Sequence, residues 1–358
     1  MITRRKTRQI SLGRVKIGGG APVSIQSMTK IKTSDVAGTV REINDLGRAG
    51  CEIIRVAVKD AADAESIRKI RAKIKIPIVA DIHFNYRLAL SAISSGADKI
   101  RINPGNISKR EELIKVIKAA KKRKIPIRIG LNSGSLPDNK ILPSTINHKL
   151  STKLASCAFQ YIKLFEEMDF RDIIVSLKAS DVVSTVRAYR ELAGKCDYPF
   201  HLGVTASGLP REGTVKSAIG IGSLLLDGIG DTIRVSLTAS SQEEVSVARH
   251  VLGALGLRKF GPEVIACPTC GRCGVDLVKI VQDLNKELQR TTNDGRRTTK
   301  HVKIAVMGCE VNGPGEARDA DIGIAAGKGS GVIFRGGKII RKVAEKDFVK
   351  ELLKELRR

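Results

Sequence analysis

The chain has 358 residues, of which 42% are hydrophobic and 28% are charged, as in a soluble globular protein with two domains. It contains neither a signal-peptide core nor an apolar run near the roughly 20 residues of a membrane span, so we expect a cytoplasmic protein without membrane attachment. The net charge of +26 is spread widely and is not interleaved with aromatic residues. We therefore favour a basic surface and an anionic small substrate over a nucleic-acid partner.

Eight short β-branched apolar runs recur in the first two thirds of the chain, and a segment with helical spacing separates each from the next. Near-continuous apolar strands separated by helices predict a parallel sheet buried on both faces. Eight repeats favour an α/β fold with a TIM-like (β/α)8 barrel over an open doubly wound sheet, which usually needs only five or six strands. The runs cover residues 23–28, 51–58, 76–83, 99–105, 125–134, 172–180, 200–208 and 232–239.

The first intervening segments have the spacing of amphipathic helices. In residues 34–50, Val36, Val40 and Ile43 share one face, and residues 61–73 repeat the pattern. Ser34 and Asp35 are candidates for the helix N-cap, and the glycine at position 50 is a stop signal.

The alternation of strand and helix segments ends after residue 256. This predicts a barrel domain at 1–258 and a second domain at 259–358. In the second domain we expect a helix at 276–288, a strand at 302–307, glycine-rich strands within 322–340 and a closing helix at 345–356. These elements suit a small α+β domain.

Basic residues follow the predicted strands at their carboxyl ends, where the active site of such a barrel forms. Five cations converging on one opening would repel one another unless an anion lies among them, and arginine matches phosphate oxygens well. The alternative is that each is an ordinary salt-bridged residue at a strand end. We favour a multiply charged substrate, most simply a diphosphate, held by Arg55, Arg101, Arg128, Lys178 and Arg234.

Asp81 and His83 lie two residues apart on one predicted strand and so share a face at the same opening. Either could move protons there, although a histidine in such a place is as often structural.

Three cysteines at intervals of three, Cys267, Cys270 and Cys273, form a C-x2-C-x2-C pattern, and Cys309 follows downstream. This spacing favours an iron–sulfur cluster. Structural zinc would need two separated C-x2-C pairs or added histidine, and bare redox thiols are the remaining alternative. Glu316 follows a Gly-Pro-Gly turn near Cys309 and is either a surface residue or an oxygen ligand.

Long stretches of the chain resemble one bacterial family, the 4-hydroxy-3-methylbut-2-enyl diphosphate synthases of the non-mevalonate isoprenoid pathway. The resemblance covers nearly the whole sequence in order, through VSIQSMT, CEIIRVAV, VADIHF, KIRINPGN, IRIGLNSGSL, HLGVT, GIGDTIRVSL, CPTC and GCEVNGPGEA. It implies a TIM-like barrel joined to a small domain with one [4Fe-4S] cluster. It also implies a head-to-tail homodimer, with flavodoxin or ferredoxin as electron donor.

The implied reaction is the reductive ring opening and dehydroxylation of 2-C-methyl-D-erythritol 2,4-cyclodiphosphate to (E)-4-hydroxy-3-methylbut-2-enyl diphosphate. By resemblance the cluster ligands are Cys267, Cys270, Cys309 and Glu316, and Asp81, His83 and Glu316 are catalytic. The resemblance further implies substrate contacts from Arg55, Arg101, Asn103, Arg128, Asn132, Lys178, Arg234 and Ser236.

Two positions depart from the family pattern. Ala206 stands where the family has a glutamate that donates a proton, so Glu212, Asp81 or a water would have to replace it. An alternative is a weakened or diverged homologue that binds the cyclic diphosphate or senses redox state. The other departure is Cys273, which we expect to be a spare thiol rather than a competitor of Glu316.

Overall fold

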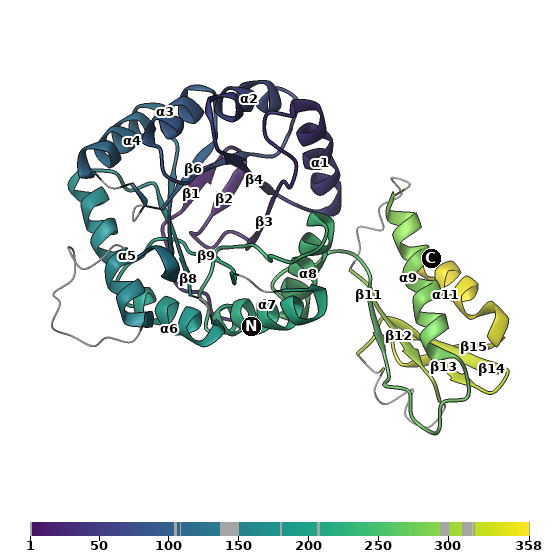
Figure 1. The fold of residues 1–358 in the computed structure, drawn as a ribbon. Helices are drawn as coiled ribbons and strands as arrows, with labels where there is room; N and C mark the ends of the chain where they lie inside the picture. Colours follow the sequence, from purple (N-terminus) through teal and green to yellow (C-terminus); the bar gives the residue numbers. More distant parts are fainter. Residues whose placement is uncertain are drawn as a thin grey trace. The chain divides into compact units, whose positions relative to one another are not determined.

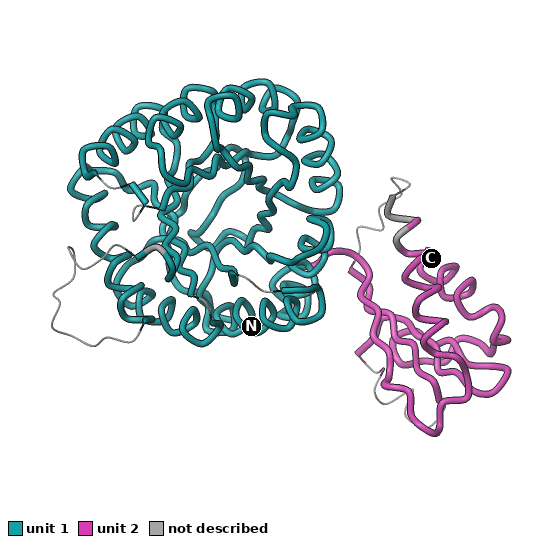
Figure 2. The backbone as a smooth tube through the Cα atoms, in the orientation of Figure 1, with its two compact units in different colours: residues 1–258 teal, residues 259–358 magenta. Residues whose placement is uncertain are grey.

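The computed structural model describes residues 2–103, 106–107, 109–136, 150–179, 181–205, 208–293, 301–309, 317 and 319–357. The chain divides into two compact units, Met1–Arg258 and Lys259–Arg358 (Figure 2). Within the described ranges, none of the helices combines the length and the apolar character that crossing a membrane would require.

The first unit is a ring of parallel strands enclosed by helices, which confirms the predicted TIM-like barrel (Figure 1). Successive strands pair side by side from β3 to β8, β9 pairs with β10, and β10 pairs with β3. A parallel bridge between Val175 and Phe200 joins β8 to the segment before β9. The strands are β3 (Ser24–Met28), β4 (Ile53–Val58), β5 (Ile78–Ile82), β6 (Lys99–Ile102), β7 (Ile127–Asn132), β8 (Ile173–Lys178), β9 (His201–Leu202) and β10 (Thr232–Ile233).

All eight predicted strands are present, but β9 and β10 are much shorter than the runs that predicted them. At Gly203, just after β9, a Cβ atom would lie 2.6 Å from the Arg234 carbonyl oxygen. The two segments therefore approach too closely there for a residue larger than glycine at position 203.

Helices follow the strands and surround the ring (Figure 1). As predicted, the Asp35 side chain caps the first helix by accepting a hydrogen bond from the Gly38 amide, and Gly50 ends it with a left-handed φ of 107°. The helices are α1 (Val36–Ala49), α2 (Ala61–Arg71), α3 (Tyr86–Ser94), α4 (Arg110–Arg123), α5 (Leu150–Glu167), α6 (Val182–Ala193), α7 (Pro210–Leu226) and α8 (Ser241–Ala254), with a 3-10 turn η2 (Ser133–Ser135) after β7.

A hairpin that the sequence did not lead us to expect closes the amino end of the barrel. Its strands, β1 (Ile10–Leu12) and β2 (Val15–Ile17), pair antiparallel. Their buried side chains form one apolar cluster with residues of three barrel strands. The cluster consists of Ile10, Leu12, Ile17, Ile53, Val79 and Ile174.

The residues before the hairpin are tied to the last part of the barrel. Arg4 forms an ion pair of 2.8 Å with the buried Asp231. Arg5 donates to the carbonyl oxygens of Cys196 and Tyr198, each at 2.5 Å, and its guanidinium lies 4.1 Å from the centre of the Phe200 ring. The basic amino terminus is therefore part of the barrel structure.

The second unit is a five-stranded sheet with α9 and α11 packed against it (Figure 1). The predicted helices and strands are present, and β11 is an additional strand at one edge. Neighbours in the sheet follow chain order, parallel from β11 to β13 and antiparallel beyond. The elements are β11 (Glu263–Ala266), α9 (Leu277–Asn293), β12 (Lys303–Met307), β13 (Ile322–Gly327), β14 (Ser330–Arg335), β15 (Lys338–Ala344), the 3-10 turn η3 (Glu345–Asp347) and α11 (Phe348–Leu356).

Replacing Leu12 by alanine should lower the free energy of unfolding of the barrel by about 2–5 kcal/mol, because the fully buried side chain would leave a cavity in the hairpin cluster. Urea unfolding followed by circular dichroism measures the change. Ser11→Ala is the matched control, since Ser11 lies in the same strand with an exposed side chain. Equal stability of the two variants would show that the hairpin does not hold the barrel closed.

Candidate active site

Five cationic side chains lie on or just after barrel strands, but the prediction that they follow the strands at their carboxyl ends is wrong for Arg128, the second residue of β7, and for Arg55, the third residue of β4. We call this set the cation ring. Three members are almost completely buried, and Lys178 and Arg234 are mostly buried. The ring consists of Arg55 on β4, Arg101 on β6, Arg128 on β7, Lys178 at the end of β8 and Arg234 just after β10.

Asp81 on β5 contacts two members of the cation ring directly. Its carboxylate lies 3.1 Å from Nη1 of Arg101 and 3.6 Å from Nε of Arg55. Strand register accounts for part of this arrangement, because Asp81 is the direct partner of Arg101 and Arg101 is the direct partner of Arg128. A single carboxylate thus organises the guanidinium groups of neighbouring strands.

The electrostatics of Asp81 follow from this arrangement. Burial alone would raise the pKa of the Asp81 carboxyl, but Arg55, Arg101 and Arg128 outweigh burial and hold the pKa well below its usual range. The group is therefore a carboxylate at neutral pH. It can accept hydrogen bonds and position cations, but it has no proton to give to a substrate.

The rest of the cation ring carries more positive charge than the neighbouring carboxylates of the protein neutralise. Burial lowers the pKa of Arg128, and the nearby Arg55 and Arg101 lower it further. In the part of the chain that is described, Nε and Nη1 of Arg128 are buried without a hydrogen-bond partner. Burial and then Arg234 likewise lower the pKa of Lys178. Buried donors and unbalanced cations of this kind indicate a site for an anion.

The other predicted residues lie around the same opening. His83 is half exposed, and its Nε2 is 3.7 Å from the Asp81 carboxylate. Asn103 is buried just after β6, Asn132 is partly buried as the last residue of β7, and Ser236 is partly buried just after β10. The predicted barrel residues thus lie on or just after strands of one barrel, at different heights along those strands.

Three buried polar residues near this site were not predicted. Lys99 lies two residues before Arg101 on β6, and its Nζ has no partner among the described residues. His201 on β9 is also buried, and burial lowers its pKa, as do Arg128, Lys178 and Lys99. Glu244 of α8 lies 3.6 Å from Arg234. The alternation of strand side chains could have revealed Lys99, but no sequence signal marks Glu244.

In the second unit, the cysteines lie on loops that leave neighbouring strands. Cys267 follows β11 and Cys309 follows β12, and these strands pair in parallel, so both loops start at the same edge of the sheet. The Gly308 amide donates to the Cys267 sulfur at 3.3 Å, the kind of contact that backbone amides make with the sulfur atoms around a cluster. Cys270 is exposed, and hydrogen bonds from Arg272 lower its pKa.

Soft sulfur donors on two adjacent loops suit an iron–sulfur cluster. However, the described residues contain no group of three or more His, Cys, Asp or Glu side chains close enough to hold a metal ion. Glu316 and Ala206 lie outside the described residues. The fourth thiol, Cys273, lies beside Gly308, where an added Cβ would meet its sulfur at 2.4 Å.

Models of known protein families match both units. The model described as "GcpE TIM-barrel domain" matches residues 7–249, and the model described as "GcpE protein C-terminal domain" matches residues 263–358. The chain belongs to the GcpE family. Thus the barrel and the cysteine-bearing unit of this GcpE-family chain are both assigned to the same family.

Curated relatives match the GcpE-family chain over its whole length. A protein of Thermodesulfovibrio yellowstonii is 53% identical over 100% of both chains, and one of Clostridium perfringens is 52% identical over 99% of both. Each is named 4-hydroxy-3-methylbut-2-en-1-yl diphosphate synthase (flavodoxin).

Solved structures agree with the barrel fold alone. Dihydropteroate synthase from Stenotrophomonas maltophilia matches with a TM-score of 0.53 at 12% identity, over 71% of this GcpE-family chain and 100% of that one. The enzyme from Xanthomonas albilineans gives a TM-score of 0.51 at 11% identity, over 69% and 97%.

Replacing Asp81 by asparagine should destabilise the barrel by about 3–5 kcal/mol at pH 7, because it leaves buried guanidinium groups without their carboxylate. The pKa of Asp81 is lowered by folding, so its contribution is complete above the ordinary value of about 3.9 and is lost as the pH falls toward the lower folded value. Unfolding measured from pH 7 to pH 2.5 should therefore show the two proteins converging below about pH 4. A difference that does not depend on pH would contradict this account.

Proposed function

We propose that the chain catalyses the reductive ring opening and dehydroxylation of 2-C-methyl-D-erythritol 2,4-cyclodiphosphate to 4-hydroxy-3-methylbut-2-en-1-yl diphosphate. The observation that carries this proposal is the cation ring with its buried, unpartnered Arg128 donors, on a chain 53% identical to a synthase of that name. A diphosphate is the anion that five converging cations with one central carboxylate would suit.

The reaction consumes two electrons and breaks the bond between a ring carbon and a diphosphate oxygen. A hydroxyl group departs as water after taking up a proton, and a carbon–carbon double bond forms. Negative charge grows on the released diphosphate oxygen. The cation ring is already fixed by packing and by Asp81, so it would stabilise that charge without rearranging.

Among the described residues at the site, His83 is our candidate for handling the proton. Asp81 is held as a carboxylate, and Glu212 is an exposed residue in the first turn of α7. His83 lies beside Asp81 and is half exposed toward the opening. The neighbouring carboxylate would orient the imidazole.

For the second unit we propose a [4Fe-4S] cluster held by Cys267, Cys270, Cys309 and Glu316. The support is the family resemblance, the loops at one sheet edge and the Gly308 amide on the Cys267 sulfur. When bound, the cluster would supply the two electrons one at a time, received from flavodoxin or ferredoxin. A carboxylate holds iron more weakly than a thiolate, so Glu316 would be the ligand that yields to substrate.

We further propose a head-to-tail homodimer, because the cation ring and the cysteines belong to different units of the chain. All seven cysteines are described and none is in a disulfide. Unpaired thiols in this number suit a reducing compartment, and we propose the cytoplasm.

Anaerobically purified protein should consume the cyclic diphosphate when dithionite supplies electrons. Arg128→Gln should lose nearly all of this turnover and keep its iron, because the variant changes only the diphosphate site. Lys118→Gln is the control, since Lys118 is exposed on α4. The measurement is product formation together with iron and sulfide per chain.

His83→Gln should reduce turnover by about 10²–10⁴-fold without loss of iron if His83 handles the proton.

A wild-type chain that holds four irons but has no turnover would favour the weakened homologue, and Ala206→Glu would then restore activity. Zinc in place of iron would reject the proposed cofactor.

The cysteine variants separate ligands from the spare thiol. Cys267→Ser, Cys270→Ser and Cys309→Ser should each lose most of the iron, whereas Cys273→Ser should keep iron and sulfide at the wild-type level. The difference arises because serine replaces a thiolate ligand in the first three chains only. Loss of the cluster in Cys273→Ser would instead indicate four thiolate ligands.

A further inference from the structure

Glu244 is a buried acidic residue to which the proposed reaction gives no role. It lies in the first turn of α8, and its side chain is only 2% exposed. Its Oε1 atom accepts a hydrogen bond from the Leu237 amide at 2.9 Å, and its Oε2 atom lies 3.6 Å from Nη2 of Arg234. Glu244 therefore contacts both ends of the segment 234–237, which follows β10 and carries Ser236.

Glu244 is also the main counter-charge of Arg234. Burial lowers the pKa of the Arg234 guanidinium, and Glu244 opposes this shift more strongly than Asp81 does. Nε of Arg234 and Oε2 of Glu244 are both buried without a hydrogen-bond partner among the described residues. The contact therefore balances the charge of Arg234 without using all of its hydrogen-bond donors.

The loop between β3 and α1 approaches the same carboxylate. Nζ of Lys30 lies 3.9 Å from Oε1 of Glu244, and the Lys30 amide donates to the Glu42 carboxylate at 3.1 Å. Oγ of Ser241, three residues before Glu244 on α8, lies 3.1 Å from Oε1 of Glu42 and 3.2 Å from the Met28 carbonyl oxygen. The first turn of α8 thus joins the segment after β10 to the end of β3.

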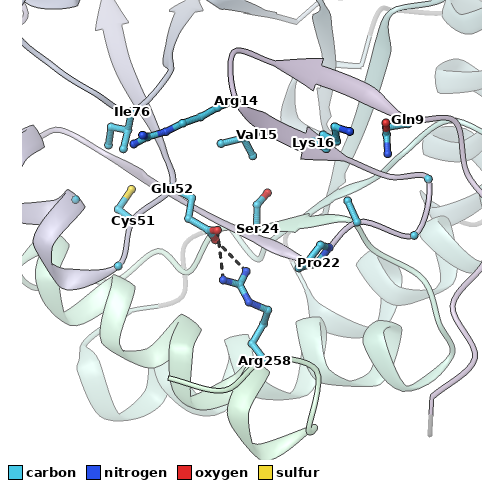
Figure 3. Close-up of a pocket in the computed structure, with 15 residues that line it drawn as sticks. Gln9, Arg14, Val15, Lys16, Pro22, Ser24, Cys51, Glu52, Ile76 and Arg258 are labelled. Atoms are coloured by element: carbon cyan, nitrogen blue, oxygen red, sulfur yellow. Dashed lines mark hydrogen bonds and ion pairs between the residues drawn. The ribbon is translucent and has the colours of Figure 1, made fainter. Parts of the chain in front are cut away.

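Helix α8 is also anchored farther along the chain. Arg258, four residues after the helix, donates to the Val23 carbonyl oxygen at 2.7 Å and pairs with Glu52 at 3.1 and 3.3 Å (Figure 3). Within the helix, Arg249 donates at 3.0 Å to the carbonyl oxygen of Ala49, the last residue of α1. The carboxylate in the first turn of α8 is therefore placed by a rigid element and not by a loop.

We propose that Glu244 is a positioning residue for the diphosphate and acts through Arg234. Its carboxylate would hold the Arg234 guanidinium in the cation ring and fix the Leu237 amide, and with it Ser236. This inference rests on the proposed function, which assigns Arg234 to the diphosphate. Without the carboxylate, a buried guanidinium would lose its main counter-charge and would move toward solvent, away from the substrate.

Glu244→Gln tests the role of the charge, because glutamine has nearly the same shape and can still accept the Leu237 amide. Calorimetric titration of the full chain with inorganic diphosphate should show binding weakened by about tenfold or more, since a charged donor loses its fixed orientation. In turnover with dithionite, KM for the cyclic diphosphate should rise by a larger factor than kcat falls. Glu243→Gln is the matched control and should behave like the wild type, because Glu243 lies in the same turn with an exposed side chain.

A double variant separates positioning from a purely structural role. Once glutamine replaces Arg234, Glu244 has no guanidinium to hold. Arg234→Gln combined with Glu244→Gln should therefore bind diphosphate no more weakly than Arg234→Gln alone. The double variant leaves neither charge of the buried pair without its partner, so it tests the inference even if Glu244→Gln alone does not fold.

The outcomes distinguish this inference from the proposed function. Unchanged or tighter diphosphate binding in Glu244→Gln would overturn the inference and leave the function intact, and so would a further loss of binding in the double variant. A wild-type chain that binds diphosphate without turnover would reject the function, while the binding of the variants would still decide the role of Glu244. A wild-type chain with neither binding nor turnover would overturn both.

Discussion

The ion contacts of Asp81 are the constraint on which the carboxyl end of the barrel depends. Five cations that converge in a partly desolvated space would separate if nothing held them, and one carboxylate at 3.1 and 3.6 Å from two guanidinium groups is the main fixed counter-charge. The compensation is incomplete, which leaves donors such as those of Arg128 available. The remaining positive charge favours binding of an anionic substrate. The hydrogen-bond donors are already oriented in the folded protein, so binding does not have to reorganise them.

The strands, the caps of α1 and the main elements of the second unit could be predicted because each depends on local sequence. Asp35 and Gly50 illustrate this, since a capping side chain and a left-handed glycine act within one helical turn. The members of the cation ring could be predicted from their places in the apolar runs, but their heights along the strands could not, since Arg128 is only the second residue of β7. Their ion pairing could not be predicted either, because it depends on register between strands that are far apart in the sequence.

The hairpin of β1 and β2 was missed for a different reason. Its strands have three residues each, and a basic segment surrounds them, so the apolar alternation of Ile10, Leu12 and Ile17 is a weak signal. Lys99 and His201 were missed because only the carboxyl ends of the runs were searched, whereas each of these residues begins its strand. The cysteine spacing, by contrast, indicated the chemistry of a cluster without indicating how the ligands come together, and the described residues do not assemble three of them.

The contacts of Arg4 and Arg5 also bear on the order in which the barrel can form. These residues are synthesised first, but their partners near Cys196, Tyr198 and Asp231 follow about two hundred residues later in the chain. The ring cannot close, and its floor cannot be held in place, until that distant segment has emerged. Contacts over such sequence separations slow folding. The hairpin side chains can meet Ile53 and Val79 early, but the contacts of Arg4 and Arg5 form only after the segment up to residue 231 has been made, so anchoring of the amino terminus is a late step in assembly of the barrel.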